Sequence, residues 1–274
     1  MGDSGSCHGI EKHDLPVPCS NNVGLICHAV MHYFSLMKNI HDLSRMRSRK
    51  FVFRDREHGG DILAEMLFPA YGEREDTMVI GIPSGGVPVA VRIAVALKLP
   101  MDLLIVRKLP VPGNPEAGFG AITLSGEMFL NDPLIYKLRL TPGQIEEQAV
   151  RVKKELERRN RLFRHGRIAP VVSDRTVIVV DDGLASGFTM MAALRDLEKA
   201  GAARLVVAAP TGSENSIERL ARSVHEIYCP NIRSGTYFAV AEAYRSWYDL
   251  YEDEVLALLG EFREAGGETD QESR

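Results

Sequence analysis

The sequence of 274 residues lacks the features that mark several classes of protein. Its longest mostly apolar run, residues 23–37, is interrupted by Cys27, His28, His32 and Ser35, whereas a membrane helix needs roughly 18 apolar residues in succession. Charge of one sign is also missing, because 33 Lys and Arg residues against 37 Asp and Glu residues leave a formal net charge of −4. We therefore expect neither a membrane span nor a general polyanion-binding surface.

Cysteine is scarce, and its placement does not suit a secreted protein. The four cysteines form no Cys-x-x-Cys pair, and three of them lie in the first 27 residues, which argues against a disulfide framework in a chain of this length. The apolar run follows Asp3, Glu11 and Asp14 but only one lysine, which is the wrong charge for a signal peptide. These observations favour a reducing, cytoplasmic location.

The first 48 residues differ in composition from the rest. They contain five of the eight histidines and show no clear hydrophobic period over their first half, so we expect residues 1–48 to form a mobile N-terminal extension. His28 and His32, with Cys19 and Cys27 nearby, raise the alternative of a metal site, although the cysteine spacing matches no standard zinc module.

From residue 49 onward, apolar β-rich runs alternate with helical patterns, which indicates one folded domain over residues 49–262 and a polar C-terminal tail over residues 263–274. The runs are rich in Val and Ile and lack polar alternation, as expected for strands covered on both faces. We predict an α/β fold in which helices flank a Rossmann-like central parallel β-sheet. The expected strands are 77–82, 102–106, 176–180, 204–209 and 224–229, and the expected helices are 87–99, 141–165, 188–200 and 252–262.

The helix expected at residues 141–165 carries many charges. It begins with a capping-box pattern at Thr141 and Gln144, and its basic residues lie mostly off its apolar stripe, with acidic residues at i,i+4 spacing. We interpret residues 151–167 as a solvated face, and a nucleic-acid groove is the alternative. The apolar stripe consists of Ile145, Ala149, Val152, Leu156 and Phe163.

The most informative segment is VIVVDDGLASGFT, residues 177–189. It joins four apolar residues to two carboxylates, Asp181 and Asp182, and then to a loop of small residues that opens a helix. Open parallel sheets hold ligands at the carboxyl ends of their strands, and backbone N–H groups at a helix start suit a phosphate. A ligand with a phosphate close to vicinal hydroxyls, such as a ribose 5-phosphate, would satisfy both halves.

Phosphoacceptor domains and the Mg-binding strand of nucleotide hydrolases also place aspartates after an apolar strand, but neither fits this segment well. A P-loop nucleotide hydrolase would need G-x-x-x-x-G-K-[ST], which the sequence lacks. A serine hydrolase would need G-x-S-x-G, yet Ile82 and Leu184 stand two residues before Ser84 and Ser186. A passive strand–turn–helix is the remaining alternative, and the specific chemistry of the turn disfavours it.

The sequence resembles the type I phosphoribosyltransferases, whose signature is four apolar residues followed by D-D-x-x-x-[ST]-G-x-T. Asp181, Asp182, Ser186, Gly187 and Thr189 match this signature position by position. From about residue 51 to residue 259, the chain is similar to a little-characterised bacterial and archaeal branch of that family. The similarity is carried by the signature and by FRDREHGGDILAEML, GIPSGGVPVA, VRKLPVPGNPEAGFGAI and YFAVAEAYRSWYDLYEDEVLALL.

The resemblance implies that the protein binds 5-phosphoribosyl 1-diphosphate (PRPP) together with Mg²⁺. Asp181 and Asp182 are expected to hydrogen-bond the ribose hydroxyls, to assist Mg²⁺ mostly indirectly through ligand and water, and to stabilise a cationic sugar. The 5-phosphate is expected on the signature loop, and pyrophosphate on the turn that follows strand 77–82, where glycines permit close approach. The loop comprises Ala185, Ser186, Gly187, Phe188 and Thr189, and the turn comprises Ser84, Gly85 and Gly86.

Positive charge near the pyrophosphate is expected from Arg107 and Lys108, at the end of the strand predicted at residues 102–106. Many members of the family have a basic residue where this sequence has Ser84. Arg107 and Lys108 are therefore expected to supply part of the positive charge that the basic residue would give to the pyrophosphate site. A pair of exposed strand-end cations is the alternative. Lys108 is also a candidate catalytic residue, together with Asp181 and Asp182.

Residues 109–120 are rich in Pro and Gly, and we expect them to form a mobile lid without regular structure that excludes water. Glu116 lies within this lid and is the fourth candidate catalytic residue, as a base or an acceptor contact. A solvated loop carboxylate is the alternative.

A small hood formed by residues 51–71 and 237–259 is expected to set the choice of acceptor. Its aromatic residues either stack on a base or fill the core, and we favour the core because aromatic side chains are usually buried. These residues are Tyr237, Phe238, Tyr244, Trp247 and Tyr248.

The resemblance implies transfer of the phosphoribosyl group from PRPP to a nitrogenous, nucleobase-like acceptor, with release of pyrophosphate and inversion at C1. A PRPP-sensing regulator without turnover and a hydrolase of ribose phosphate esters are the alternatives. No membrane partner is expected, a nucleic-acid partner is not favoured, and a homodimer is the assembly considered.

Overall fold

Six parallel strands form a central sheet in the computed structural model, which describes residues 39–167, 170–235 and 237–267. The strands occur in the order β1-β10-β8-β7-β2-β3, and every neighbouring pair is parallel. The predicted central parallel sheet is therefore confirmed. In chain order, the strands are β1 (Ile40–His41), β2 (Thr77–Gly81), β3 (Met101–Leu103), β7 (Thr176–Val180), β8 (Arg204–Ala208) and β10 (Glu226–Tyr228).

The strands β2 and β7 are buried along their whole length. They pair in register from Thr77 opposite Thr176 to Gly81 opposite Val180. Their Val and Ile residues suit this setting, because β-branched side chains pack well on a pleated surface that is covered on both faces. β2, β7 and β8 match the predicted bounds within one residue, whereas β3 and β10 are shorter than predicted.

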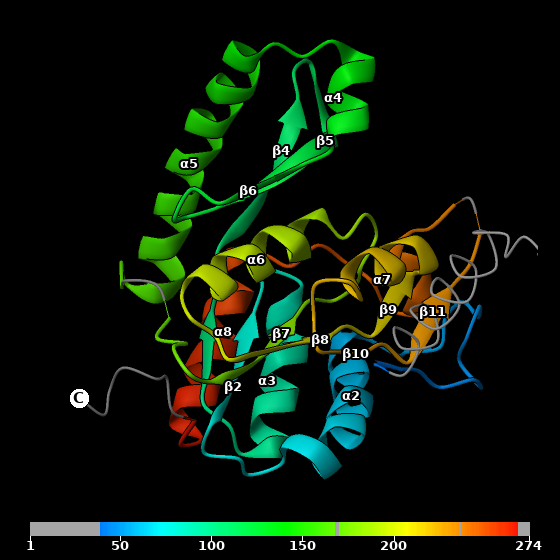
Figure 1. The fold of residues 1–274 in the computed structure, drawn as a ribbon. Coiled ribbons are helices and arrows are strands. Elements are labelled where there is room, and N and C mark those ends of the chain that lie inside the picture. The colour runs from blue at the N-terminus through cyan, green and yellow to red at the C-terminus, as the bar shows by residue number, and fades with distance from the viewer. Residues whose placement is uncertain (1–38, 168–169, 236, 268–274) are drawn as a thin grey trace, which may run out of the picture. The chain divides into compact units, whose positions relative to one another are not determined.

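Helices cover both faces of the central sheet (Figure 1). On one face, α2 packs against α3 and α3 against α8, while α6 lies on the other face. Within the described part of the chain, no helix combines the length and the apolar character needed to cross a membrane. The helices that cover the two faces are α2 (Arg56–Tyr71), α3 (Gly86–Leu97), α6 (Phe188–Lys199) and α8 (Glu252–Glu264). Two further helices, α7 (Glu214–Leu220) and the short 3₁₀ helix η1 (Val240–Ala243), contact β9 (Thr211–Ser213).

An antiparallel layer follows β3 in the chain. Its strands are β4 (Val106–Val111), β5 (Asn114–Thr123) and β6 (Met128–Leu130), in that order, and they lead into α4 (Asp132–Leu138) and α5 (Pro142–Arg164). α5 contacts β4 and β5, and α6 contacts all three strands, so α6 is shared between the two sheets (Figure 1). A further parallel pair joins β9 (Thr211–Ser213) to β11 (Asn231–Arg233).

The expected lack of regular structure at residues 109–120 is wrong, because this segment forms most of the β4–β5 hairpin. Its role as a mobile lid stays a prediction. The pairing register shifts at Pro110, and a proline, which has no N–H, is tolerated at such an irregularity. A Cβ atom at Gly118 would lie 2.3 Å from Lys108 Cγ. This glycine therefore allows close cross-strand approach rather than loosening the chain.

The segments predicted to form a hood meet only in part. Phe53 forms a parallel β-bridge with Tyr244, and both side chains belong to one buried apolar cluster. Most of residues 51–71, however, is α2, which belongs to the helix layer over the central sheet.

Residues 40–41, which the sequence analysis places in the extension, form β1 at the edge of the central sheet. The His41 ring stacks on Tyr228 with centroids 4.3 Å apart and hydrogen-bonds Glu226 at 3.1 Å. The side chains of the alternative metal site lie outside the described residues, as does most of the expected extension. They are Cys19, Cys27, His28 and His32.

The capping box of α5 at Thr141 and Gln144 is confirmed, but the prediction of a solvated basic face is wrong for Arg159 and Arg164. Both side chains are buried. Arg164 donates two hydrogen bonds to the Asp102 carboxylate, from Nε at 2.9 Å and from Nη2 at 2.8 Å. This ion pair ties the C-terminal end of α5 to strand β3.

Replacing Asp102 by Asn should lower the free energy of unfolding by about 3–5 kcal/mol, since it leaves the charge of Arg164 buried without its carboxylate. Asp61→Asn is the matched control, because its ion pair with Arg92 lies at the surface, with the two side chains 35% and 50% exposed, and should be worth about 0–1 kcal/mol. Denaturant unfolding of both variants measures the difference. Equal stability losses would contradict this role for the buried pair.

Candidate active site

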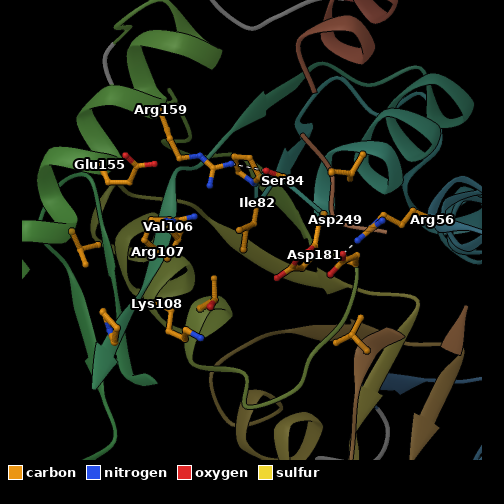
Figure 2. Close-up of a pocket in the computed structure, with 18 of the residues that line it drawn as sticks. Arg56, Ile82, Ser84, Val106, Arg107, Lys108, Glu155, Arg159, Asp181 and Asp249 are labelled. Atoms are coloured by element: carbon orange, nitrogen blue, oxygen red, sulfur yellow. Dashed lines mark hydrogen bonds and ion pairs between the residues drawn. The ribbon is translucent and has the colours of Figure 1, made fainter. Parts of the chain in front are cut away.

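The strands β2 and β7 are neighbours in the sheet, and the chain leaves them toward opposite edges of the sheet. β2 leads through α3 to β3, and β7 leads through α6 to β8. Because the two crossover helices cover opposite faces, a crevice opens beyond the carboxyl ends of these strands. The structure has a cavity of about 750 Å³ there (Figure 2).

The cavity is acidic in one part and basic in another. Asp181, Asp182 and Asp249 contribute carboxylates, and Figure 2 shows Asp181 and Asp249 on the side of Arg56. The basic part combines cations of β4 with cations of α5 and one carboxylate, Glu155, and Ser84 lies between the two parts (Figure 2). The four cations are Arg107, Lys108, Arg151 and Arg159.

Asp181 and Asp182 follow directly on β7 and both line the cavity. Asp181 Oδ1 accepts a hydrogen bond from the backbone N–H of Asp182 at 2.8 Å. The backbone carbonyl of Asp182 in turn accepts the hydroxyl proton of Tyr244 at 2.5 Å. These bonds fix the backbone on which the two carboxylates stand.

Arg56, the first residue of α2, holds the Asp182 carboxylate. Its Nε donates to Asp182 Oδ2 at 2.9 Å, and its Nη1 donates to the carbonyl of Tyr248 at 2.9 Å. Its guanidinium carbon lies 3.8 Å from the centre of the Trp247 ring, a cation–π contact. α2 can place Arg56 here because Asp55 caps the helix by accepting from the His58 backbone N–H at 2.8 Å.

Burial raises the pKa of both carboxyl groups of the pair, Asp181 and Asp182. Removal from water raises the pKa of Asp181 well above its usual range, and the charge of Asp182 beside it raises that pKa further. The pKa of Asp182 is also raised by burial, but the charge and hydrogen bond of Arg56 oppose the shift. Asp181 is thus the carboxyl of the pair that holds a proton more readily.

The signature loop leads from the acidic pair into α6. Gly187 caps this helix with φ of 74°, a conformation that favours glycine, and Thr189 lines the cavity. Ala185 and Ser186 stand in the turn between, where their carbonyls accept hydrogen bonds from Ser213 and Arg219. The Phe188 ring packs against Phe129 with centroids 5.6 Å apart.

The turn after β2 approaches the acidic pair closely. Ser84 and Gly85 line the cavity, and the Pro83–Ser84 peptide bond is cis. A Cβ atom at Gly85 would lie 1.9 Å from Asp182 Oδ2, and one at Gly86 would lie 2.6 Å from the carbonyl oxygen of Val180. Both glycines are therefore needed for the turn to fit against β7.

Arg107 and Lys108 both line the cavity, but they lie inside β4 rather than at the end of the strand predicted at residues 102–106. The chain leaves the central sheet after β3 and begins a second strand at Val106. The side chain of the remaining catalytic candidate, Glu116, lies outside what the structure describes.

The aromatic residues of the expected hood have different surroundings. Tyr244 is fully buried, as favoured from the sequence. Trp247 lines the cavity but carries Arg56 over its ring and Tyr244 beside it. Phe238 lies under Arg233, whereas Tyr237 and Tyr248 are exposed.

Two buried arginines of the site, Arg56 and Arg159, were not identified from the sequence. A signal was present for Arg159, because it stands three residues after Leu156 and four before Phe163, on the apolar stripe of α5. For Arg56, the only signal is an arginine directly after the helix cap Asp55.

The carboxylates of the cavity determine whether it could hold a metal ion. Among residues 39–167, 170–235 and 237–267, no three His, Cys, Asp or Glu side chains come together as a metal site. The two aspartates offer carboxylate oxygens, which Mg²⁺ prefers, and Mg²⁺ is commonly held by one or two carboxylates together with substrate phosphates and water. The residues present therefore fit an ion bound mainly through a phosphorylated ligand.

Comparison with known proteins places this site in a family. The family model described as the phosphoribosyl transferase domain matches residues 55–246. These residues include the Ser84 turn, the signature segment and Arg56. The chain belongs to the phosphoribosyl transferase domain family, and its fold is the α/β fold that the sequence predicts.

Individual relatives agree with this assignment. The chain is 36% identical to TT1426 from Thermus thermophilus, with a TM-score of 0.62 to its crystal structure; the match covers 76% of this chain and 98% of that one. It is 37% identical over 219 residues to two Mycobacterium tuberculosis proteins, of strains CDC 1551 and H37Rv, which are provisionally named phosphoribosyl transferases. That match covers 78% of this chain and 49% of each relative, so the chain spans about half the length of these curated relatives.

A methyl group added at Gly85 should displace the Asp182 carboxylate and break its ion pair with Arg56. We expect Gly85→Ala to lower the free energy of unfolding by about 1–3 kcal/mol, the usual cost of overpacking. Gly143→Ala is the control, since a Cβ atom there meets nothing within 4 Å. If denaturant unfolding gave the two variants the same stability, the close approach would not be energetically significant.

The acidic pair predicts a specific pH dependence. Because the pKa of Asp181 is raised in the folded state, the free energy of unfolding should fall as pH rises through that pKa. Asp182→Asn should lower the pKa of Asp181, because it removes a neighbouring negative charge. Denaturant unfolding over a range of pH measures the first effect, and carboxyl ¹³C NMR titration of Asp181 measures the second. An unchanged Asp181 titration in the variant would contradict the coupling.

Proposed function

We propose that the protein is a phosphoribosyltransferase that transfers the phosphoribosyl group of PRPP to a nitrogenous acceptor and releases pyrophosphate. The observation that carries the proposal is the cavity itself: the acidic pair, the start of α6 and the Ser84 turn face one space. Together they offer acceptors for sugar hydroxyls and N–H donors for phosphate groups. Membership of the phosphoribosyl transferase domain family supports this assignment.

The polarity of the cavity suits the charge changes of this reaction. As the C1–O bond breaks, its electron pair leaves with pyrophosphate and the sugar gains positive charge. The carboxylates of Asp181 and Asp182 would stabilise that charge, and their fixed positions mean that no solvent reorganisation is needed. Arg107 and Lys108 would hold the departing anion from β4. Attack by the acceptor from the opposite face of the sugar gives inversion at C1.

The acceptor would carry N–H groups. Asp249 presents a carboxylate to the cavity on the side of Arg56 (Figure 2), and a carboxylate can only accept hydrogen bonds when ionised. A nitrogenous, nucleobase-like acceptor supplies the matching donors. The ring of Trp247 is less suited to stacking on it, because Arg56 already lies over that ring.

Mg²⁺ would be held by the phosphate groups of PRPP and by water, with Asp181 and Asp182 assisting. When bound, it would neutralise part of the charge on the diphosphate. This chain's own residues would orient the sugar and bind the phosphates.

Isothermal titration with PRPP and MgCl₂ tests the proposal. The wild-type protein should bind PRPP, and Asp181→Asn should weaken binding by roughly tenfold or more, because it removes a charged partner of the sugar hydroxyls. This variant is preferable to one at Asp182, which would leave Arg56 buried without its counter-charge. Asp174→Asn, on an exposed residue outside the cavity, is the control.

Pyrophosphate release is then measured with a panel of nitrogenous bases. Release that depends on a base supports transfer, and release with free ribose 5-phosphate as the product indicates a hydrolase. PRPP binding without release for any acceptor indicates a regulator. Absence of PRPP binding by the wild-type protein would contradict both the transferase and the regulator.

A further inference from the structure

Arg159 is a buried cation whose hydrogen-bonding groups are only partly satisfied. Its side chain is 5% exposed, and its Nη2 donates a hydrogen bond to Ser84 Oγ at 2.6 Å. Its Nε atom is buried and has no hydrogen-bond partner among the described residues; a carboxylate oxygen of Glu252 is 3.7 Å away. A buried N–H group without an acceptor costs free energy, so the site favours a ligand that supplies one.

Another arginine of the same helix shows what a purely structural role looks like. Arg164 is equally buried, but its Nε and Nη2 donate to Asp102, and its Nη1 donates to Asn160 and to the carbonyl of Arg167. Within the described part of the chain, Arg159 has no comparable hydrogen-bonded carboxylate. The difference indicates that Arg159 is held for a partner from outside the chain.

The charged residues that the structure describes around Arg159 leave its Nε atom without a hydrogen-bond acceptor. Glu252, the first residue of α8, is already engaged by Arg158, which donates to both of its carboxylate oxygens at 2.9 and 2.5 Å. Burial lowers the pKa of Arg159, and the positive charge of Arg107 lowers it further, whereas Glu252 and Glu155 oppose the shift. Arg158 donates hydrogen bonds to both of these carboxylates. Positive charge is thus in local excess, and a bound anion would relieve it.

The position of Arg159 identifies the anion. It lines the same cavity as Asp181 and touches Ser84, the uncharged first residue of the glycine turn. We propose that Arg159 binds the diphosphate of PRPP and the released pyrophosphate, and that it supplies from α5 the positive charge that the Ser84 turn itself lacks. This inference rests on the proposed function, since it assumes that PRPP is the ligand.

The proposed diphosphate site has parts in both the central sheet and the antiparallel layer. α5 belongs to the antiparallel layer and the Ser84 turn to the central sheet. An anion held by both would bridge the two layers, so affinity for pyrophosphate depends on where α5 lies. The 5-phosphate loop, at the start of α6, does not require this contact.

Titration calorimetry with Mg²⁺-pyrophosphate and, separately, with ribose 5-phosphate tests the inference. Arg159→Gln should bind pyrophosphate roughly tenfold to a hundredfold more weakly than the wild type, because a charged hydrogen bond is lost. Its affinity for ribose 5-phosphate should be unchanged. Arg161→Gln, the same charge change at an exposed position of α5, should leave both affinities unchanged.

Two further variants guard against misfolding as an explanation. Arg159→Lys keeps the charge and should retain more pyrophosphate affinity than Arg159→Gln. Ser84→Lys combined with Arg159→Gln moves the charge to a side chain that stands 2.6 Å away in the wild type, and it should recover part of the lost affinity.

The outcomes separate this inference from the proposed function. Wild-type binding of PRPP with unchanged pyrophosphate affinity in Arg159→Gln would overturn the role of Arg159 and leave the proposed function standing. Equal losses for pyrophosphate and ribose 5-phosphate would also overturn it, because they indicate a structural role. A wild-type protein that binds neither PRPP nor pyrophosphate would overturn both.

Discussion

The site depends on the adjacency of β2 and β7 in the central sheet. Each strand ends at the same edge, and their crossover helices depart to opposite faces, so the chain leaves space where two turns converge. One turn carries two carboxylates and the other carries glycines that allow it to come within contact distance of them. Because both strands are fully buried and held in register over five residue pairs, the two turns that follow them have fixed positions relative to each other.

Charge is separated within the cavity by the fold itself. The acidic pair comes from the central sheet and Asp249 from the segment before α8, whereas most of the cations, together with Glu155, come from the antiparallel layer. Carboxylates and guanidinium groups at close range would normally neutralise each other, and Arg56 does pair with Asp182 in this way. Placing the other cations on a separate layer keeps them apart from the acidic pair, on the far side of the space that a ligand would fill.

Most of the sheet could be predicted from the sequence, because fully buried parallel strands read as uninterrupted Val and Ile runs. The acidic pair and the loop of residues 185–189 were predictable for a different reason, since they are contiguous in the chain. The hairpin at residues 106–123 was not, because its Pro and Gly residues are typical of irregular loops, and only the partner strand reveals that they mark register shifts and close contacts. Arg56 and Arg159 were missed because each reaches the cavity from a distant helix, and a charged residue on a helix is usually solvated.

The first strand of the sheet has a practical implication for protein production. β1 consists of only two residues, yet it covers the outer side of β10, and His41 stacks there on Tyr228. A shortened version that starts at residue 49 would strip this cover and leave a row of unpaired backbone groups on β10. Exposed strand edges of this kind recruit other chains, so such a version would be prone to self-association even though every residue of the cavity is retained.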